Sequence, residues 1–408
     1  MPASKTRFAA GLAVFIALSL SAPTAGAAEK YGPGASDKEI KIGNIAPYSG
    51  PASAYAMFGK AEAAYFKKVN DEGGINGRKI VFISYDDAYS PPKAVEQARK
   101  LIESDEVLLI FSPVGTPSNS AIAKYLNGKK VPQLFVASYA DKWNDPKAFP
   151  WTMGLGTSYA TEGASYAKYI VAEKPGAKIA VLYQNDDAGK ELLKGLKNGL
   201  GENSKMIVAE KSYEVSEPTI ESHVVELKTS GADVFVSFAT PKFAAQSIKK
   251  SSELGWHPLF VIPNVSSSVG ATLKPAGFDK AQGIISATYL KDALDPQWGS
   301  DEGMKRYLEF LEKDMPGVDR ADNVAASGYL AAQAMVQVLK QCDNDLTREN
   351  VMKQAANLKG FQADLLIPGI TVNTGAEDYS PIKDMQLMRF VGDRWQLFGE
   401  VITGTAKN

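Results

Sequence analysis

The sequence has few of the residues that most enzymes use for proton transfer and metal binding. Among 408 residues there are one cysteine and two histidines. The lone Cys342 has no partner for an internal disulfide bond. His223 falls in a predicted helix and His257 in a turn before a proline, where surface and turn roles are the usual ones. We therefore predict no catalytic residues and no enzymatic activity.

Motifs of the common catalytic and cofactor sites are also missing. There is no Gly-x-Ser-x-Gly elbow, no phosphate loop and no His-Glu-x-x-His pair. Gly154-Leu155-Gly156 begins like a dinucleotide fingerprint, but Tyr159 stands where a third glycine belongs. The acidic pairs Asp86-Asp87 and Asp186-Asp187 lack the spacing of a calcium loop, and we interpret them as solvated strand ends. No cofactor and no metal site is predicted.

Strong charge of one sign and long apolar runs are absent from most of the chain. The net charge is −1, and lysine and arginine are dispersed among acidic residues, which argues against nucleic acid as a partner. The exception is the N-terminus, where Lys5 and Arg7 precede an apolar run and then small residues. That run is shorter than the roughly 20 residues of a membrane span. We predict a signal peptide over residues 1–28, cleaved near 27–28, and a periplasmic protein.

From residue 40 onward, short apolar runs alternate with segments of helical spacing. This alternation is typical of a parallel sheet covered by helices. The first series predicts strands at 40–45, 79–85, 107–111 and 133–137, and helices at 58–70 and 92–103. The second series predicts strands at 178–183, 206–210, 234–238 and 259–262, and helices at 159–172, 189–200 and 241–254. The tail adds a strand at 283–289, helices at 303–313, 324–340 and 348–357, and β-like stretches up to 402. Two α/β lobes of like construction follow from this pattern.

One strand, loop and helix, residues 108–121, is the best candidate for a binding loop. Thr116 is expected to cap the helix, with Pro117 at its first position, where a missing N–H costs nothing. Gly115 leaves room for close approach, so the free N–H groups of the first turn form a plausible cradle for a carboxylate. The alternative is a turn capped only for stability.

Several of these stretches together resemble one family, the leucine/isoleucine/valine-binding type of periplasmic solute-binding protein in ABC importers. The matching stretches are Ile45-Ala46-Pro47-Tyr48-Ser49-Gly50-Pro51, Asn70-Asp71-Glu72-Gly73-Gly74-Ile75-Asn76-Gly77, Tyr85-Asp86-Asp87, Asn185-Asp186-Asp187-Ala188-Gly189 and Gly328-Tyr329. The resemblance covers nearly the whole mature chain. It implies a periplasmic binding protein type I fold, in which two doubly wound parallel-sheet lobes surround a ligand cleft and are joined by a multi-strand hinge. The first lobe would comprise residues 36–154 and 288–382, and the second 155–287 and 383–403.

The resemblance also implies a set of ligand-binding positions. The first lobe would hold a substrate carboxylate, and aromatic side chains would shape the rest of the pocket, with Phe58 as an alternative to Tyr55. The implied positions are Tyr55, Gly115, Thr116, Ser138, Ala140, Ala188, Thr240, Asn264 and Tyr329.

Three of these positions depart from the pattern of amino-acid binders in the family. Asn264 replaces an acid that pairs with the substrate ammonium, and an amide cannot supply that charge. Ala188 and Thr240 stand where aromatic residues are common, which leaves room for a bulkier ligand. The first interpretation is capture of a branched-chain amino acid or a related small carboxylate. An aromatic or other non-amino organic acid is the alternative.

The resemblance further implies delivery of the ligand to ABC permease subunits in the inner membrane by a monomeric protein. Two other function classes remain open at this point. The same fold serves as a ligand-sensing module in front of a separate signalling partner, and a secreted α/β hydrolase would use His223 or the acidic pairs.

Overall fold

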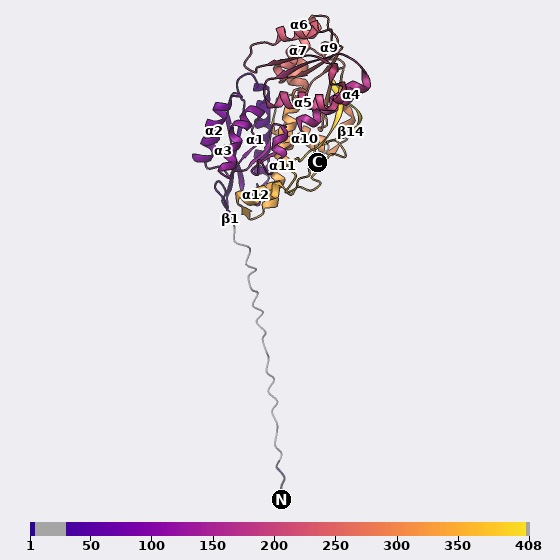
Figure 1. Cartoon of the computed structure of the whole chain (residues 1–408). Helices are drawn as coiled ribbons and strands as arrows, with labels where there is room; N and C mark the ends of the chain where they lie inside the picture. Colours follow the sequence, from indigo (N-terminus) through magenta and orange to yellow (C-terminus); the bar gives the residue numbers. More distant parts are fainter. Residues whose placement is uncertain (5–29, 405–408) are drawn as a thin grey trace.

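The computed structural model describes residues 1–4 and 30–404. Apart from its first four residues, the predicted signal peptide lies outside the described residues. The described chain forms two α/β halves, each built around its own sheet (Figure 1). We refer to them as the five-stranded half and the seven-stranded half.

The sheet of the five-stranded half is parallel throughout, as the alternation predicts. Its strand order is β3 (Lys79–Asp86), β2 (Glu39–Ala46), β4 (Leu109–Phe111), β5 (Gln133–Val136) and β6 (Thr152–Gly154). The helices of this half are α1 (Ala56–Asp71), α2 (Pro91–Glu103), α3 (Thr116–Gly128), α10 (Glu302–Asp314), α11 (Asn323–Cys342) and α12 (Arg348–Ala355). A short parallel pair joins β1 (Lys30–Tyr31) to β12 (Asp345–Leu346).

The sheet of the seven-stranded half is parallel except at one edge. Its order is β14 (Arg394–Thr403), β13 (Asp384–Val391), β11 (Ile285–Thr288), β10 (Leu259–Val261), β9 (Val234–Phe238), β7 (Ile179–Gln184) and β8 (Ile207–Tyr213). The β-like tail forms β13 and β14, a hairpin added antiparallel to β11. The helices are α4 (Tyr159–Glu173), α5 (Asp187–Leu200), α6 (Glu221–Thr229), α7 (Pro241–Glu253), α8 (Lys274–Ala276) and α9 (Phe278–Ala281).

Apolar side chains at helical and strand spacing build the two cores. In α2, Ala94, Ala98 and Leu101 recur every three or four residues and are fully buried. In α1, the ring of Phe66 lies 5.3 Å from that of Phe82 and 5.5 Å from that of Phe111, counted between centroids. Such contacts hold the helices on the sheet and leave the loops at the strand ends free for other roles.

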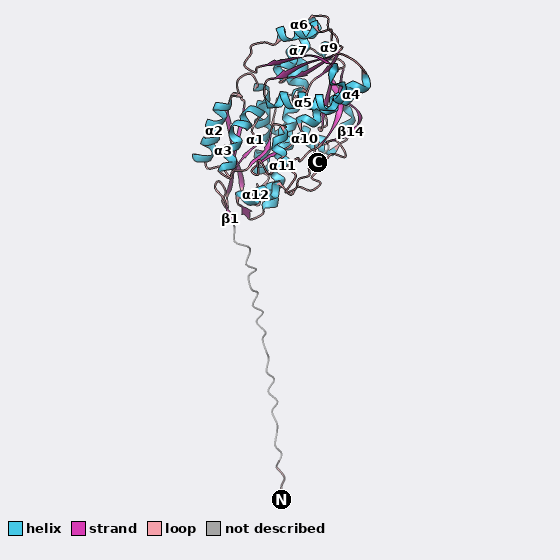
Figure 2. Ribbon diagram, in the orientation of Figure 1, coloured by secondary structure: helices cyan, strands magenta, loops and turns pink. Residues whose placement is uncertain are grey.

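The chain passes from one half to the other more than once. The crossings lie between β6 and α4, between β11 and α10, and before β13. As a result α11, late in the sequence, packs beside α1. Figure 2 shows helices lying beside the strands in both parts of the molecule. Connections through several segments permit a hinge movement between the halves, which the sequence predicts and which remains a prediction. Among the described residues, no helix has the length and apolar character needed to cross a membrane.

Candidate functional site

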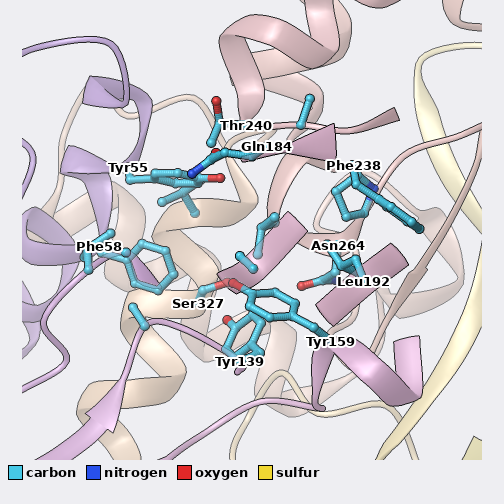
Figure 3. A pocket seen from close by; sticks show the side chains of 18 of the residues that line it. Tyr55, Phe58, Tyr139, Tyr159, Gln184, Leu192, Phe238, Thr240, Asn264 and Ser327 are labelled. Atoms are coloured by element: carbon cyan, nitrogen blue, oxygen red, sulfur yellow. The ribbon is translucent and has the colours of Figure 1, made fainter. Parts of the chain in front are cut away.

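A cavity lies between the two halves and encloses about 800 Å³, counting the space at its mouth. Figure 3 shows side chains from both halves directed into it. The lining includes Tyr55, Phe58, Tyr89, Gly115, Tyr139, Asn323 and Ser327 from the five-stranded half, and Tyr159, Gln184, Ala188, Leu192, Phe238, Thr240 and Asn264 from the other.

Five helices begin at this cavity. Four of them have their N-cap or first residue in the lining: Gly115 for α3, Tyr159 for α4, Thr240 for α7 and Asn323 for α11. The fifth, α5, begins at Asp187, next to the lining residue Ala188. A helix N-terminus carries partial positive charge and N–H groups without an intrahelical acceptor. Among the lining residues that the structure describes there is no Asp, Glu, Lys, Arg or His. Ser158, Asp186 and Asp322 cap α4, α5 and α11 with their side chains, whereas α3 and α7 have no side-chain cap. The starts of α3 and α7 are therefore the parts of the cavity that favour an anion.

The start of α3 needs a glycine. Gly115 is the N-cap residue with φ of 94°, and a Cβ atom there would lie 2.4 Å from the ring of Tyr89. The side-chain nitrogen of Asn119 donates to the carbonyl oxygens of Pro113 at 2.7 Å and of Gly115 at 2.8 Å. These bonds hold the loop before α3 in place without using the N–H groups at the helix start.

The expected role of Thr116 as helix cap is wrong. The helix α3 begins at Thr116, and no side chain caps it. The hydroxyl of Thr116 instead pairs with that of Ser138 at 2.7 Å, and Nε1 of Trp143 donates to the same Ser138 oxygen at 2.9 Å. Because the threonine lies inside the first turn, its hydroxyl turns toward the end of β5 rather than toward its own helix.

Aromatic residues form most of the cavity wall. Tyr55, Tyr89, Tyr139 and Tyr159 are each less than a tenth exposed. Burial raises the pKa of Tyr139 to about 12 and also raises the pKa values of the other three. All four rings are therefore neutral at physiological pH, and they provide an apolar wall with hydroxyl groups at its edge.

Asn264 presents a neutral oxygen to the cavity from η4 (Asn264–Ser266). Its side-chain nitrogen donates to the carbonyl oxygen of Ala287 at 2.8 Å, and Figure 3 shows its side-chain oxygen turned toward the cavity. Its main-chain N–H donates to Oε1 of Glu162 at 2.6 Å. Glu162 lies on α4, fully buried, directly behind this lining residue.

The carboxyl group of Glu162 has an unusual environment. Oε1 accepts a second hydrogen bond, from the hydroxyl of Tyr166 at 2.6 Å, whereas Oε2 is buried without a partner. Desolvation by burial raises the pKa of this group to about 7, although both hydrogen bonds oppose the shift. No pattern in the sequence distinguished Glu162 from an ordinary helix surface residue, and it was missed.

The acidic pairs at the strand ends are less solvated than expected. Asp87 is fully buried and accepts a hydrogen bond from the hydroxyl of Ser118. Asp186 caps α5 by accepting from the N–H of Gly189 at 3.0 Å, and it also accepts from Nε2 of Gln184 at 2.7 Å. Desolvation raises the pKa of Asp186 to about 6. These carboxylates fix the loops beside the cavity, which explains their place after the strands.

Polar contacts between the two halves flank the cavity. Nζ of Lys142, in η2 (Asp141–Asn144), lies 2.6 Å from Oδ2 of Asp187 on α5, and the N–H of Asp141 donates to Glu191 at 2.9 Å. At the start of α11, the hydroxyl of Ser268 donates to Asp322 at 3.1 Å. The halves are thus drawn together on both the α5 and the α11 sides.

The structure brings together most of the positions named from the sequence. Tyr55, Gly115, Ala188, Thr240 and Asn264 line the cavity. Thr116, Ser138 and Ala140 are buried behind the lining and are absent from it. Their role in binding a ligand remains a prediction.

Tyr329 lies elsewhere. Its hydroxyl donates to Oδ2 of Asp364 at 2.7 Å, and its ring contacts Tyr65 in the core between α1 and α11. Val324 and Ser327, three residues apart on α11, face the cavity instead. Because successive helix residues are about 100° apart, a residue two positions after Ser327 points the other way.

Comparison with known proteins agrees with this architecture. Residues 39–394 match the family model described as periplasmic binding protein. A Leu/Ile/Val-binding protein homolog 7 from Brucella suis is 26% identical over 346 residues, which cover 80% of this chain and 82% of the relative.

Two solved structures of ABC transporter proteins share the fold. One, from Thermus thermophilus, is a branched chain amino acid ABC transporter with bound valine. It has a TM-score of 0.81 and 18% identity, with 90% of this chain and 97% of that chain covered. The other is a solute-binding protein from R. palustris in complex with benzoate. Its TM-score is 0.76 and its identity 19%, with 91% and 98% covered. At these identities the likeness concerns the fold.

Proposed function

We propose that this chain, which belongs to the periplasmic binding protein family, captures a small organic anion that has an apolar or aromatic body and no charged amino group. The chain is a substrate-binding protein of the Leu/Ile/Val-binding type of ABC transporter family. The observation that carries the finer proposal is the meeting of two uncapped helix starts, those of α3 and α7, at a cavity whose described lining includes no ionisable acid or base other than tyrosine.

Electrostatics favour the carboxylate end of such a ligand. The start of α3 has no side-chain cap, so the N–H groups of its first turn are available to an anion. Proline follows the first residue of α3 and opens α7, and neither helix has a side-chain cap bond. A carboxylate placed at α3 would gain charge-assisted hydrogen bonds there without a lysine or arginine.

The same lining is unfavourable for an ammonium group. A buried ammonium needs a nearby anion or several oriented oxygens to offset its desolvation. The side-chain oxygen of Asn264 is one neutral acceptor, and the positive ends of the helices oppose a cation. The aromatic wall of Tyr55, Tyr159 and Phe238 suits an apolar or flat ligand body instead.

In this account the protein binds its ligand and breaks no bond. A ligand that contacts both halves favours the closed arrangement by its differential affinity for it, and the halves would then open and close at the crossing segments. We place this activity in the periplasm, with a monomeric protein delivering the ligand to the permease subunits of the importer.

The test is a matched pair of ligands. Leucine and its deaminated analogue 4-methylpentanoate share a carbon skeleton and differ by the amino group. Isothermal titration of the purified protein, cleared of bound solutes by unfolding and refolding, should show binding of 4-methylpentanoate or benzoate and weaker or no binding of leucine. Binding of leucine in the micromolar range without binding of its analogue would overturn the proposal.

A branched-chain amino acid is the second candidate. The relatives named for such ligands favour it. One feature of the site also favours an amino acid. The buried carboxyl of Glu162 lies directly behind Asn264, a residue of the cavity wall, and accepts its main-chain N–H. The same leucine titration decides between the two candidates.

A further inference from the structure

We propose that Glu162 is a specificity-determining residue of the cavity: it is protonated when an organic anion is bound, so that capture of the ligand takes up a proton from solvent. The inference rests on the proposed function, because its sign depends on the ligand being a net anion. It assigns a role to a residue that does not itself line the cavity.

The position of Glu162 couples it to the ligand. Its Oε1 holds the main-chain N–H of Asn264, whose side chain lines the cavity, at 2.6 Å. Tyr159, one helical turn earlier on α4, and Tyr139, in the loop after β5, are lining residues as well. A charge at Glu162 is therefore separated from the cavity by the lining residue Asn264.

The surroundings of Glu162 do not compensate a negative charge. On its own helix it faces the hydroxyl of Tyr166, which also lies 3.5 Å from the hydroxyl of Ser286 on β11. From η4 it faces the N–H of Asn264. The remaining titratable groups near it are Tyr139 and Tyr289, whose hydroxyls bond to each other at 2.9 Å. Within the described residues, Glu162 makes no ion pair, and Oε2 has no hydrogen-bond partner.

A second negative charge in the cavity would act on this group directly. Two like charges in a water-poor interior repel each other strongly, and a buried carboxylate without a cation is already costly. Binding of a carboxylate ligand therefore favours the protonated form of Glu162. Burial raises the pKa of this carboxyl to about 7 against the opposing effect of its two hydrogen bonds, so the proton is exchanged within the physiological range.

The experiment measures binding of benzoate and of 4-methylpentanoate between pH 6 and pH 8.5. For the wild-type protein the Kd should rise above pH 7, by up to about tenfold per pH unit for one proton. At pH 8 the buffer supplies the proton that the protein takes up, so the observed binding enthalpy should differ between phosphate and Tris. The size of this difference should correspond to uptake of close to one proton per bound ligand.

Glu162→Gln should remove most of this dependence, because glutamine keeps the acceptor for Asn264 and cannot ionise. Desolvation also raises the pKa of Asp186 to about 6 and that of Glu191 to about 7, so these groups can contribute to the pH dependence of Kd. The contribution of Glu162 is therefore the part of that dependence which wild type shows and Glu162→Gln lacks. The matched control is Glu62→Gln. Glu62 is also fully buried and has an unpartnered oxygen, but it lies on α1 and pairs with Asn44.

A second variant covers the case in which Glu162→Gln does not fold. Tyr166→Phe removes a donor that stabilises the ionised form, so the pH at which Kd begins to rise should move upward. A merely structural role of Glu162 would not move this midpoint.

The two proposals fail in distinguishable ways. If a carboxylate binds with no proton uptake, or with an uptake unchanged in Glu162→Gln, the inference is overturned and the proposed function stands. If neither carboxylate binds and leucine does, the proposed function is overturned and the inference falls with it.

Discussion

Lys142 in η2 and Asp187 at the start of α5 form an ion pair of 2.6 Å that joins the five-stranded half to the seven-stranded half. Each belongs to a loop or helix start beside the cavity, and neither lines it. Because the pair crosses between the halves, we expect it to stabilise their contact and not the fold of either half.

Asp187→Asn is expected to weaken ligand binding modestly. The side chain of Asp187 is 54% exposed, so the pair is worth about 0.2–1 kcal/mol, which corresponds to a Kd increase of at most about fivefold. The loss should shrink at high salt because screening already weakens the wild-type pair. Titration at two salt concentrations measures it. Glu210→Gln is the control, since it breaks the pair with Lys197 inside one half.

Gly115→Ala should destabilise the protein and abolish tight binding. An alanine there is strained at φ of 94° and collides with the ring of Tyr89. Gly73→Ala is the matched control, because Gly73 has φ of 106° and open space around it. We expect the control to lose about 1 kcal/mol in unfolding free energy from strain alone. Thermal melts and titrations of both variants give the comparison, and equal losses would contradict the collision.

Ser138→Ala should cost about 1–3 kcal/mol of unfolding free energy. The change leaves Nε1 of Trp143 and the hydroxyl of Thr116 without their shared partner in a buried site. Denaturant titration of the ligand-free variant measures the stability, and calorimetry measures the affinity. If Ser138 also holds the ligand carboxylate, the affinity of the folded variant falls as well. An unchanged affinity would place the carboxylate elsewhere.

The stability of the ligand-free protein should fall between about pH 4.5 and pH 7 in a way that depends on Glu162. Its pKa is about 7 in the folded state and near its ordinary value when unfolded, so in this window only the folded state holds the proton. The stabilisation is complete below the unfolded pKa and is lost as the pH rises, at up to about 1.4 kcal/mol per pH unit.

The measurement is urea unfolding at several pH values. Glu162→Gln should show a flatter profile than wild type, whereas Glu173→Gln, at the exposed end of the same helix, should follow wild type. A wild-type profile that coincides with that of Glu162→Gln would contradict the buried, unpaired state of the carboxyl.

The sequence allowed most of the fold to be predicted, because alternating apolar runs and helical spacing reflect burial directly. The strand at 234–238 and the helix beginning at Pro241 agree with β9 and α7. The β-like tail forms the local hairpin β13–β14. Its antiparallel addition to β11 was not predicted, because the partners, such as Ser286 and Met388, lie far apart in the sequence and leave no local pattern.

The site was harder to predict than the fold. Loops after strands can be recognised from their composition, and Gly115 and Asn264 line the cavity. The direction of a side chain on a helix depends on packing, which is why Ser327 and not Tyr329 faces the cavity. Glu162 was missed because its importance comes from burial behind Asn264, a contact between residues 102 positions apart.

The most direct test is to identify the molecule that the protein carries. The exported protein is purified from its own cells without exchange of bound solutes, denatured, and the released small molecules are identified by mass spectrometry. Our account predicts a carboxylic acid without an amino group, present in near-stoichiometric amount. Stoichiometric leucine, isoleucine or valine would contradict it.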